Sequence, residues 1–258
     1  MIAFIAAILA AMPASPTPVQ PPASAPLVEQ QPLAAIPVRP TAKSDFESRL
    51  DEIDARAKKV ATLRAKFVQR KHTPLLKKAL ESSGRVTTKG GNARWDTVAP
   101  RRSVMTTDPR GLQIFYPDQQ VLEKYSLGGD LRGLVGSPLP TLGALRESFD
   151  ISPGKASDLG GSDDDDSLLV IELLPKTVEL KGHVARVRVL IDTRIPAARR
   201  IQFVDVDGER TEIEFKDVEV NKPVADAEVS QDMPPGTREV YPLGNPAAEA
   251  SMPTEPLK

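Results

Sequence analysis

The chain has 258 residues, with 34 Lys and Arg, 35 Asp and Glu, two His and no Cys. This length allows one or two domains. The formal net charge of −1 provides no basic face of the kind that nucleic acids need, so no nucleic-acid partner is expected. The absence of Cys excludes disulfides, thiolate metal sites and a cysteine nucleophile.

The N-terminal part of the chain has no composition typical of a folded core. Residues 1–14 contain the uncharged run Ile2–Met12, which is too short to span a bilayer and is typical of a secretory signal. The alternative is a disordered, mildly apolar start of a cytoplasmic protein. Residues 15–43 are proline-rich and predict an extended linker. We expect one domain over residues 44–240 and a disordered tail over residues 241–258, which are rich in Pro, Ala and Glu.

The domain is expected to begin with an amphipathic helix. Ser44 and Glu47 have the spacing of a capping box, in which each side chain accepts a hydrogen bond from the other residue's backbone. Apolar residues then recur every three or four positions, which places them on one side of a helix. These residues are Phe46, Leu50, Ile53, Ala57 and Val60.

After this helix the apolar period changes to two, which is typical of strands. Proline, glycine and Asp207-Gly208 interrupt the pattern and predict hairpin turns. The expected strands cover residues 63–69, 80–89, 92–97, 104–106, 112–116, 121–127, 149–152, 167–174, 184–192, 199–206 and 210–220.

The middle of the chain, between Gly128 and Glu147, differs from the rest. It is rich in leucine and is broken by glycine and proline, which predicts two short helices over about 129–135 and 139–147. With no regular alternation of strands and helices, the elements indicate an α+β fold with one large, curved antiparallel sheet of about ten strands.

Known catalytic motifs are missing from the sequence. It has no nucleophile elbow, no P-loop and no dinucleotide-binding glycine motif. His72 and His183 are expected to be surface residues, and Asp163–Asp166 to be a solvated acidic loop. We therefore predict no catalytic residues, no metal site and no cofactor.

The apolar face of the sheet is the remaining candidate for a functional site. Alternation places seven side chains on like faces of successive strands: Phe67, Val86, Trp95, Ile114, Tyr116, Phe203 and Phe215. Such a concave face either packs a core or holds an apolar ligand, and composition leaves both alternatives open, including for Trp95.

Several motifs, taken in order, resemble one family. They are Leu63-Arg64-Ala65-Lys66-Phe67-Val68-Gln69, Ser83-Gly84-Arg85-Val86, Arg94-Trp95-Asp96, Ile114-Phe115-Tyr116-Pro117-Asp118, Phe215-Lys216-Asp217-Val218-Glu219-Val220-Asn221 and Pro234-Pro235-Gly236. Together with the helix that precedes them and Pro100, they resemble the outer-membrane lipoprotein carrier family, LolA. The resemblance covers about residues 44–240.

The resemblance implies an unclosed antiparallel half-barrel of about ten to eleven strands, with an N-terminal helix and short lid helices over an apolar cavity. It implies a monomeric periplasmic shuttle for lipoprotein acyl chains, loaded by an inner-membrane ATP-driven releasing complex and unloaded at an outer-membrane acceptor. The lid would use Leu131, Leu134, Leu139, Leu142 and Leu145. The alternative is a periplasmic lipid-sensing or regulatory module on the same fold.

One position departs from the family pattern. Family members often have an Arg-Pro pair before the strand that bears the Trp, and that Arg latches the lid. This chain has Lys89-Gly90-Gly91-Asn92 there. Lys89 and Arg94 are the candidate substitutes, although Lys cannot make the planar bidentate bond of Arg.

Overall fold

The computed structural model describes residues 44–108, 111–125, 137–138 and 142–242. The signal-like segment 1–14, the linker 15–43 and most of the predicted tail 241–258 lie outside these residues. So does the predicted helix over 129–135.

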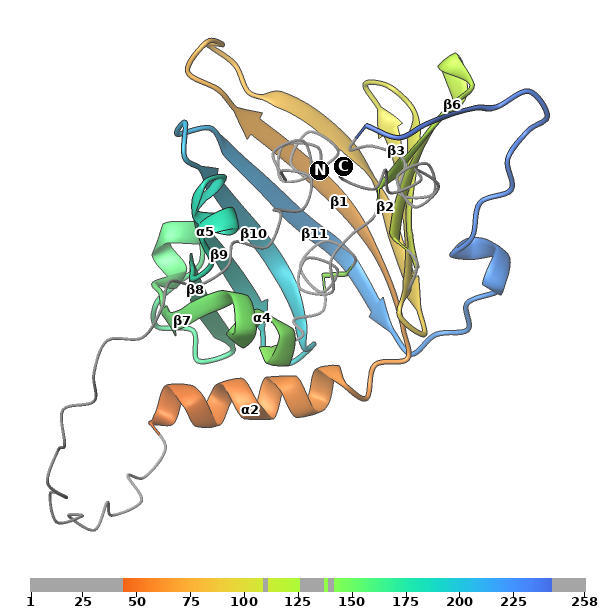
Figure 1. Cartoon of the computed structure of the whole chain (residues 1–258). Helices are drawn as coiled ribbons and strands as arrows, with labels where there is room; N and C mark the ends of the chain where they lie inside the picture. The colour runs from red at the N-terminus through yellow and green to blue at the C-terminus, as the bar shows by residue number, and fades with distance from the viewer. Residues whose placement is uncertain (1–43, 109–110, 126–136, 139–141, 243–258) are drawn as a thin grey trace, which may run out of the picture.

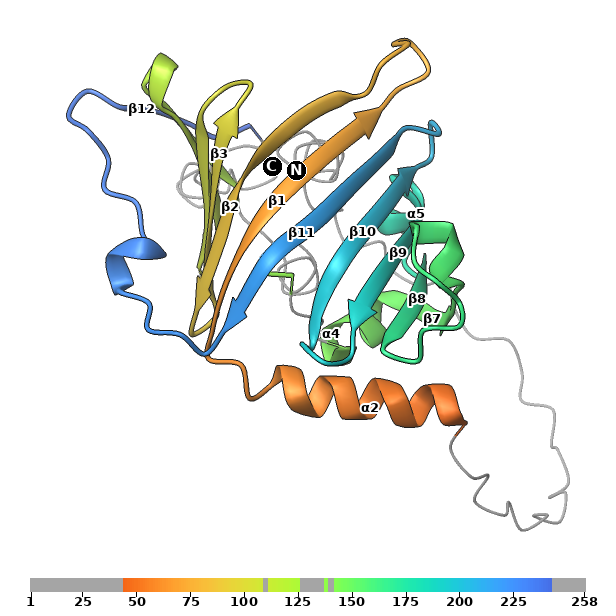
Figure 2. The same cartoon turned by 180° about the vertical axis from the view of Figure 1, so that it is seen from behind.

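The described residues form one twelve-stranded sheet with short helices (Figures 1 and 2). The helices are α2 (Asp45–Ala57), α4 (Leu142–Ser148) and α5 (Val178–Lys181), with the 3-10 turns η1 (Pro117–Gln119), η2 (Ala156–Leu159) and η3 (Asp226–Glu228). The strands are β1 (Thr62–His72), β2 (Leu80–Lys89), β3 (Asn92–Ala99), β4 (Ser103–Asp108), β5 (Gly111–Tyr116), β6 (Val121–Tyr125), β7 (Phe149–Pro153), β8 (Leu168–Pro175), β9 (Val184–Asp192), β10 (Ala197–Asp205), β11 (Arg210–Val220) and β12 (Arg238–Val240).

The sheet runs in the order β12-β6-β5-β4-β3-β2-β1-β11-β10-β9-β8-β7. Two antiparallel meanders therefore meet at β1 and β11, where Phe67 lies opposite Phe215. β7 and β12 remain at opposite edges, so the sheet is unclosed. The α+β half-barrel predicted from the sequence is confirmed, and the strand beyond the expected ten to eleven is β12, which pairs with β6 in parallel.

The predicted capping box is present at the start of α2. The Ser44 hydroxyl accepts from the Glu47 backbone N–H at 3.2 Å, and the Glu47 carboxylate accepts from the Ser44 N–H at 3.4 Å. Leu50 and Ile53 are buried against the sheet. Val60, the last residue of the predicted stripe, lies beyond the helix end but still packs against the core.

Alternation divides the sheet into two faces. We call the side that carries Phe67 and Trp95 the inner face. α4 lies over this side of the sheet (Figure 1), and its leucines belong to the same core cluster. α2 lies across one end of the strands, where the Arg56 guanidinium donates to the backbone oxygen of Arg194 at 2.8 Å. A smaller cluster on the outer face is formed by Leu159, Leu168, Leu190, Ala156 and Val170.

Candidate functional site

The inner face is centred on three aromatic rings from neighbouring strands. The Trp95 indole lies 5.1 Å from the Phe67 ring and 5.8 Å from the Phe215 ring, both measured between centroids, at interplanar angles of 60° and 61°. These tilted, edge-on arrangements are the ones that aromatic pairs prefer. The three side chains lie together because Phe67 and Phe215 are paired across β1 and β11, while Trp95 faces them from β3.

Gly84 makes this aromatic cluster possible. It pairs with Phe67 across β1 and β2, at a point where the β2–β3 register shifts. A Cβ at this position would lie 1.9 Å from the Asp96 carbonyl oxygen and 3.0 Å from the Phe67 ring. Only glycine allows the β3 backbone and the Phe67 ring to approach so closely.

The structure brings all seven predicted face residues into or against one core cluster. Val86, Ile114 and Phe203 are buried in it together with the three aromatic residues, and Tyr116 packs against it half-buried. These side chains already contact neighbours in the described structure. An apolar ligand on this face would therefore have to displace part of that packing.

A carboxylate lies on the same face, where sequence analysis did not single out a site. The Glu123 carboxylate accepts hydrogen bonds from the Tyr125 hydroxyl at 2.7 Å and the Tyr116 hydroxyl at 3.2 Å. Burial, and then the negative charge of Glu123, raises the pKa of Tyr116. Burial and the hydrogen bond to Glu123 do the same for the pKa of Tyr125. Part of the signal is in the sequence, because Glu123 and Tyr125 are two positions apart in an expected strand and so share a face. The structure adds that Glu123 pairs with Ile114 of the inner face.

Two of the five predicted lid leucines are described. Leu142 and Leu145 of α4 are buried in the core cluster, and Leu131, Leu134 and Leu139 lie outside the described residues. α4 is attached to α2 by two acidic side chains. The Leu142 N–H donates to the Asp54 carboxylate at 3.2 Å, and the Arg146 guanidinium donates to Asp51 at 3.3 Å.

The candidate latch residues contact a different part of the chain. Lys89 Nζ donates to the Val224 carbonyl oxygen at 2.9 Å and to the Asp226 carboxylate at 2.6 Å. Arg94 makes a bidentate contact with Asp96 and also donates to the Ser230 carbonyl oxygen. Alternation places both cations on the outer face, opposite Trp95. They hold the segment that follows β11, whereas the expected latch contact is with the lid.

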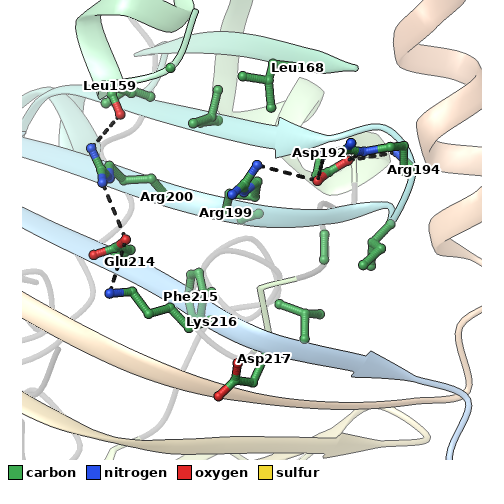
Figure 3. Close-up of a pocket in the computed structure, with 17 residues that line it drawn as sticks. Leu159, Leu168, Asp192, Arg194, Arg199, Arg200, Glu214, Phe215, Lys216 and Asp217 are labelled. Carbon is green, nitrogen blue, oxygen red and sulfur yellow. Dashed lines mark hydrogen bonds and ion pairs between the residues drawn. The ribbon is translucent and has the colours of Figure 1, made fainter. Parts of the chain in front are cut away.

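A pocket of about 480 Å³ lies where β10 and β11 diverge (Figure 3). Their pairing ends at Arg200 and Glu214, so the strand ends beyond these residues form part of the pocket's walls. The outer-face cluster supplies another part through Leu159, Leu168 and Leu190. Pro138 reaches the same place, because its carbonyl oxygen accepts from the Ala198 N–H at 2.8 Å. Phe215 lines this pocket and also belongs to the aromatic cluster of the inner face.

Most of the pocket's charged side chains are paired with one another, and Asp217 pairs with Lys66 outside the pocket. The Asp192 carboxylate accepts from the Arg194 guanidinium at 2.9 and 2.8 Å, which lowers the pKa of Asp192. Arg200 and Lys216 flank Glu214 at 3.7 and 3.5 Å (Figure 3). Among the described residues, no group of three or more His, Asp or Glu side chains could hold a metal ion. No helix in the same part of the chain is long and apolar enough to cross a membrane.

An open half-barrel with an aromatic-centred apolar face and a small helix over it defines a carrier-type binding fold. The family model described as "Outer membrane lipoprotein carrier protein LolA" matches residues 58–229, so the chain belongs to this family. The match covers every strand from β1 to β11 and both latch candidates. The resemblance noted from the sequence motifs is confirmed.

Individual relatives are distant. The chain is 29% identical over 163 residues to an outer-membrane lipoprotein carrier protein of Pseudomonas putida, which covers 60% of this chain and 70% of the relative. A solved LolA superfamily protein from Nitrosomonas europaea is similar with a TM-score of 0.40 and 13% identity, covering 73% of this chain and 99% of that one. The Mycobacterium tuberculosis lipoprotein LppX is similar with a TM-score of 0.42 and 10% identity, covering 70% and 99%.

Proposed function

We propose that this protein is a periplasmic carrier that binds the acyl chains of lipoproteins on its inner face and shuttles them from the inner membrane to the outer membrane. The observation that carries the proposal is the continuous apolar inner face centred on Trp95, in a chain that belongs to the lipoprotein carrier family. In this account the protein is exported, works as a monomer and performs no catalysis.

The energetics of acyl chains favour an escorted route. Each buried methylene is worth about 0.8 kcal/mol, so a chain of about 14 methylenes gains about 11 kcal/mol by leaving water. A lipidated protein does not cross an aqueous compartment at a useful rate against that cost. A carrier that buries only part of each chain lowers the barrier, and still permits release to a better acceptor.

Binding requires space on the inner face, and α4 is the element that can supply it. This helix has only seven residues, and one of them is Gly143. A helix of this length and composition is not stable without its contacts. Leu142 and Leu145 occupy the apolar face much as an acyl chain would. We infer that acyl chains displace these leucines, and that α4 acts as the lid.

The polar cluster of Tyr116, Glu123 and Tyr125 would set one limit of the acyl site. Its carboxylate and hydroxyls need polar partners, and burial against a hydrocarbon chain would strip them of water. The acyl chain is therefore expected to lie between this cluster and α4, over the rings of Trp95 and Phe67. A lipoprotein's polar glyceride or peptide portion would face the tyrosines.

Loading and release would need partners at both membranes. The family relationship supports an inner-membrane ATP-driven releasing complex as the donor and an outer-membrane acceptor as the recipient. Lys89 and Arg94 are engaged with residues 224–230. The lid would then be held by Leu142, Leu145, the α2 carboxylates and the two hydrogen bonds that Lys176 donates to α4 carbonyl oxygens. Opening would then cost less than it would with an arginine latch.

Two measurements test this function. Mass spectrometry of molecules that copurify with the protein from the cell envelope should detect lipoprotein-derived or other diacylated species. A fluorescent lipoprotein loaded on the protein should then move to acceptor vesicles. Bound lipid that never leaves would favour the alternative sensing module, and the absence of any bound or bindable lipid would refute both.

The place of action has its own test. N-terminal sequencing of the protein recovered from the cell envelope should find a start after Met1 and before Ser44. Recovery of the chain with Met1 intact in the cytoplasm would contradict the periplasmic assignment.

A further inference from the structure

The tip of the β1–β2 hairpin exposes three leucines. Leu75 is 90% exposed, Leu76 47% and Leu80 57%. The backbone there is ordered by a turn, in which the Leu76 N–H donates to the Thr73 carbonyl oxygen at 3.1 Å. We call residues 73–80 the β1–β2 tip. Adjacent exposed leucines on an ordered turn lower solubility without stabilising the fold, which is typical of an interaction surface.

The β1–β2 tip projects beyond the rest of the sheet. The last pairing of β2 with β3 joins Ser83 to Ala99, and β2 continues through Ser82 and Glu81 to Leu80. Three further residues of strand extend the hairpin by about 10 Å, before the turn itself is counted. Both views show the hairpin reaching past its neighbours at the end of the molecule opposite α2 (Figures 1 and 2).

The charged side chains of the β1–β2 tip are positive and unpaired. Lys77 and Lys78 lie between the exposed leucines, and no ion pair joins either of them to a carboxylate in the described part of the chain. The neighbouring β3–β4 turn carries exposed Arg101 and Arg102 next to Val98. No acidic residue lies between Lys71 and Leu80. The apolar side chains are therefore flanked by free cations, although the net charge of the whole chain is −1.

The β10–β11 tip at the same end is different. Its exposed Val206 lies between Asp205 and Asp207, and Glu209 follows and pairs with Lys71 at 2.5 Å. An acidic tip would be repelled by a negatively charged surface. The combination of exposed leucines and unpaired cations is thus a property of the β1–β2 tip with the adjoining β3–β4 turn, and not of every hairpin at this end.

We propose that the β1–β2 tip docks the protein on a bilayer surface that contains anionic phospholipids. Leu75 and Leu76 enter the boundary between headgroups and acyl chains, while Lys77 and Lys78 contact lipid phosphates. Interfacial segments bury apolar side chains about 5–10 Å deep, which matches the projection of the tip. Each cation near an anionic surface adds attraction that salt weakens. A convex tip with separate leucines suits a fluid lipid surface better than a rigid protein groove.

Docking by this tip is independent of what the inner face carries. It would hold the protein at the membrane with α2 directed away and the strand ends of β1 to β4 directed toward the lipid (Figure 1). The proposal can therefore fail while the carrier function stands, and it can hold if the inner face binds no lipoprotein.

The first test measures partitioning of the full chain onto vesicles by sedimentation. Vesicles of phosphatidylglycerol with phosphatidylcholine are compared with vesicles of phosphatidylcholine alone. Leu75→Ser with Leu76→Ser should weaken binding about tenfold, and Lys77→Glu or Lys78→Glu by about fivefold or more each at low salt. The matched controls are Val178→Ser, at an 82% exposed apolar residue of α5, and Lys181→Glu, at an exposed lysine. All variants have the same N-terminal residues, so any contribution of those residues to vesicle binding cancels in the comparison.

The second test locates the contact. Trp95 is the only tryptophan in the chain and is buried, so Leu75→Trp adds a reporter at the tip. Its emission should shift to the blue with phosphatidylglycerol vesicles, whereas Val178→Trp should not shift. An unshifted Leu75→Trp spectrum, or equal partitioning of the wild type and the leucine variants, would overturn the proposal. So would binding only to native membranes, with loss after protease treatment, since that pattern indicates a protein receptor.

Discussion

The Phe67 ring lies 5.1 Å from the Trp95 indole at an interplanar angle of 60°, and it packs against Gly84, a residue with no side chain. This relationship joins β1, β2 and β3 at the centre of the inner face. The backbone of β3 comes close to β2 because Gly84 is small, and Trp95 reaches Phe67 as a result. The position of the aromatic cluster therefore depends on a backbone feature and not only on apolar alternation.

Gly84→Ala should destabilise the fold by about 2 kcal/mol, because the new Cβ would lie 1.9 Å from the Asp96 carbonyl oxygen and would force β2 and β3 apart. Urea unfolding measures this loss. Gly143→Ala is the matched control, since a Cβ at that position would have no heavy atom within 4 Å and alanine favours helix. A Gly84→Ala protein as stable as the wild type would contradict the close approach.

The segment after β11 should depend on pH through Glu228. The Arg64 guanidinium donates to both Glu228 oxygens, at 2.8 and 2.7 Å, and this holds the pKa of that carboxyl below its usual range. A lowered carboxyl pKa contributes stability that is complete above the unfolded-state pKa, near 4.3, and is lost as the pH falls through the folded-state value.

The stability difference between the wild type and Glu228→Gln should thus be present at pH 7 and shrink progressively below about pH 4. Denaturant unfolding at a series of pH values measures it. A difference that stays constant down to pH 2.5 would show that the ion pair does not hold the segment. Lys66→Ala provides the comparison, because it removes a different ion pair, the one between Lys66 and the exposed Asp217 of β11.

The tyrosines on the inner face should resist ionisation. Burial is the larger cause of the raised pKa of Tyr116 and Glu123 is the smaller one, so the phenol stays protonated well above pH 10. A raised tyrosine pKa adds stability below the unfolded-state value, and this stability is lost as the pH rises beyond it. Ultraviolet titration of Glu123→Gln should find the pKa of both Tyr116 and Tyr125 lower than in the wild type, but still raised by burial. Unchanged titration would mean that Glu123 does not contact them.

Much of the fold follows from local sequence signals. The alternation over β1, the capping box of α2 and the Asp207-Gly208 turn were each sufficient to place an element, and Gly208 has the positive φ of 80° that such a turn needs. β12 was missed, because three residues paired in parallel to β6 carry no period of their own. α5 was missed for a similar reason: its four residues depend on the Thr177 cap.

The site was less accessible to sequence reasoning. Alternation assigned Phe67, Trp95 and Phe215 to one face, but it could not show that β10 and β11 diverge beyond Arg200 and Glu214. It also could not show that Lys89 would reach Asp226, which lies 137 positions away. Both depend on how distant strands meet, and no local pattern records that.

Lid movement should be visible by hydrogen exchange in α4. Because α4 is short and is held by Leu142, Leu145, two α2 carboxylates and hydrogen bonds from Lys176, its amides should exchange faster than those of the long, fully paired β1. Fatty acid should increase α4 exchange further by displacing the leucines. The 3-10 turn η2, which packs on the outer face, is the internal control and should not respond. Slow α4 exchange that no lipid alters would show that the helix is fixed core packing.

The most direct measurement of the central claim uses Trp95, the single tryptophan at the centre of the inner face. Palmitate brominated along its chain quenches tryptophan only at contact distance, and unlabelled palmitate serves as the control. If acyl chains lie on the inner face, the brominated chain should quench most of the Trp95 emission in a saturable way that unlabelled palmitate reverses. Saturable binding of the same fatty acid without quenching of Trp95 would place the chain elsewhere and contradict the account.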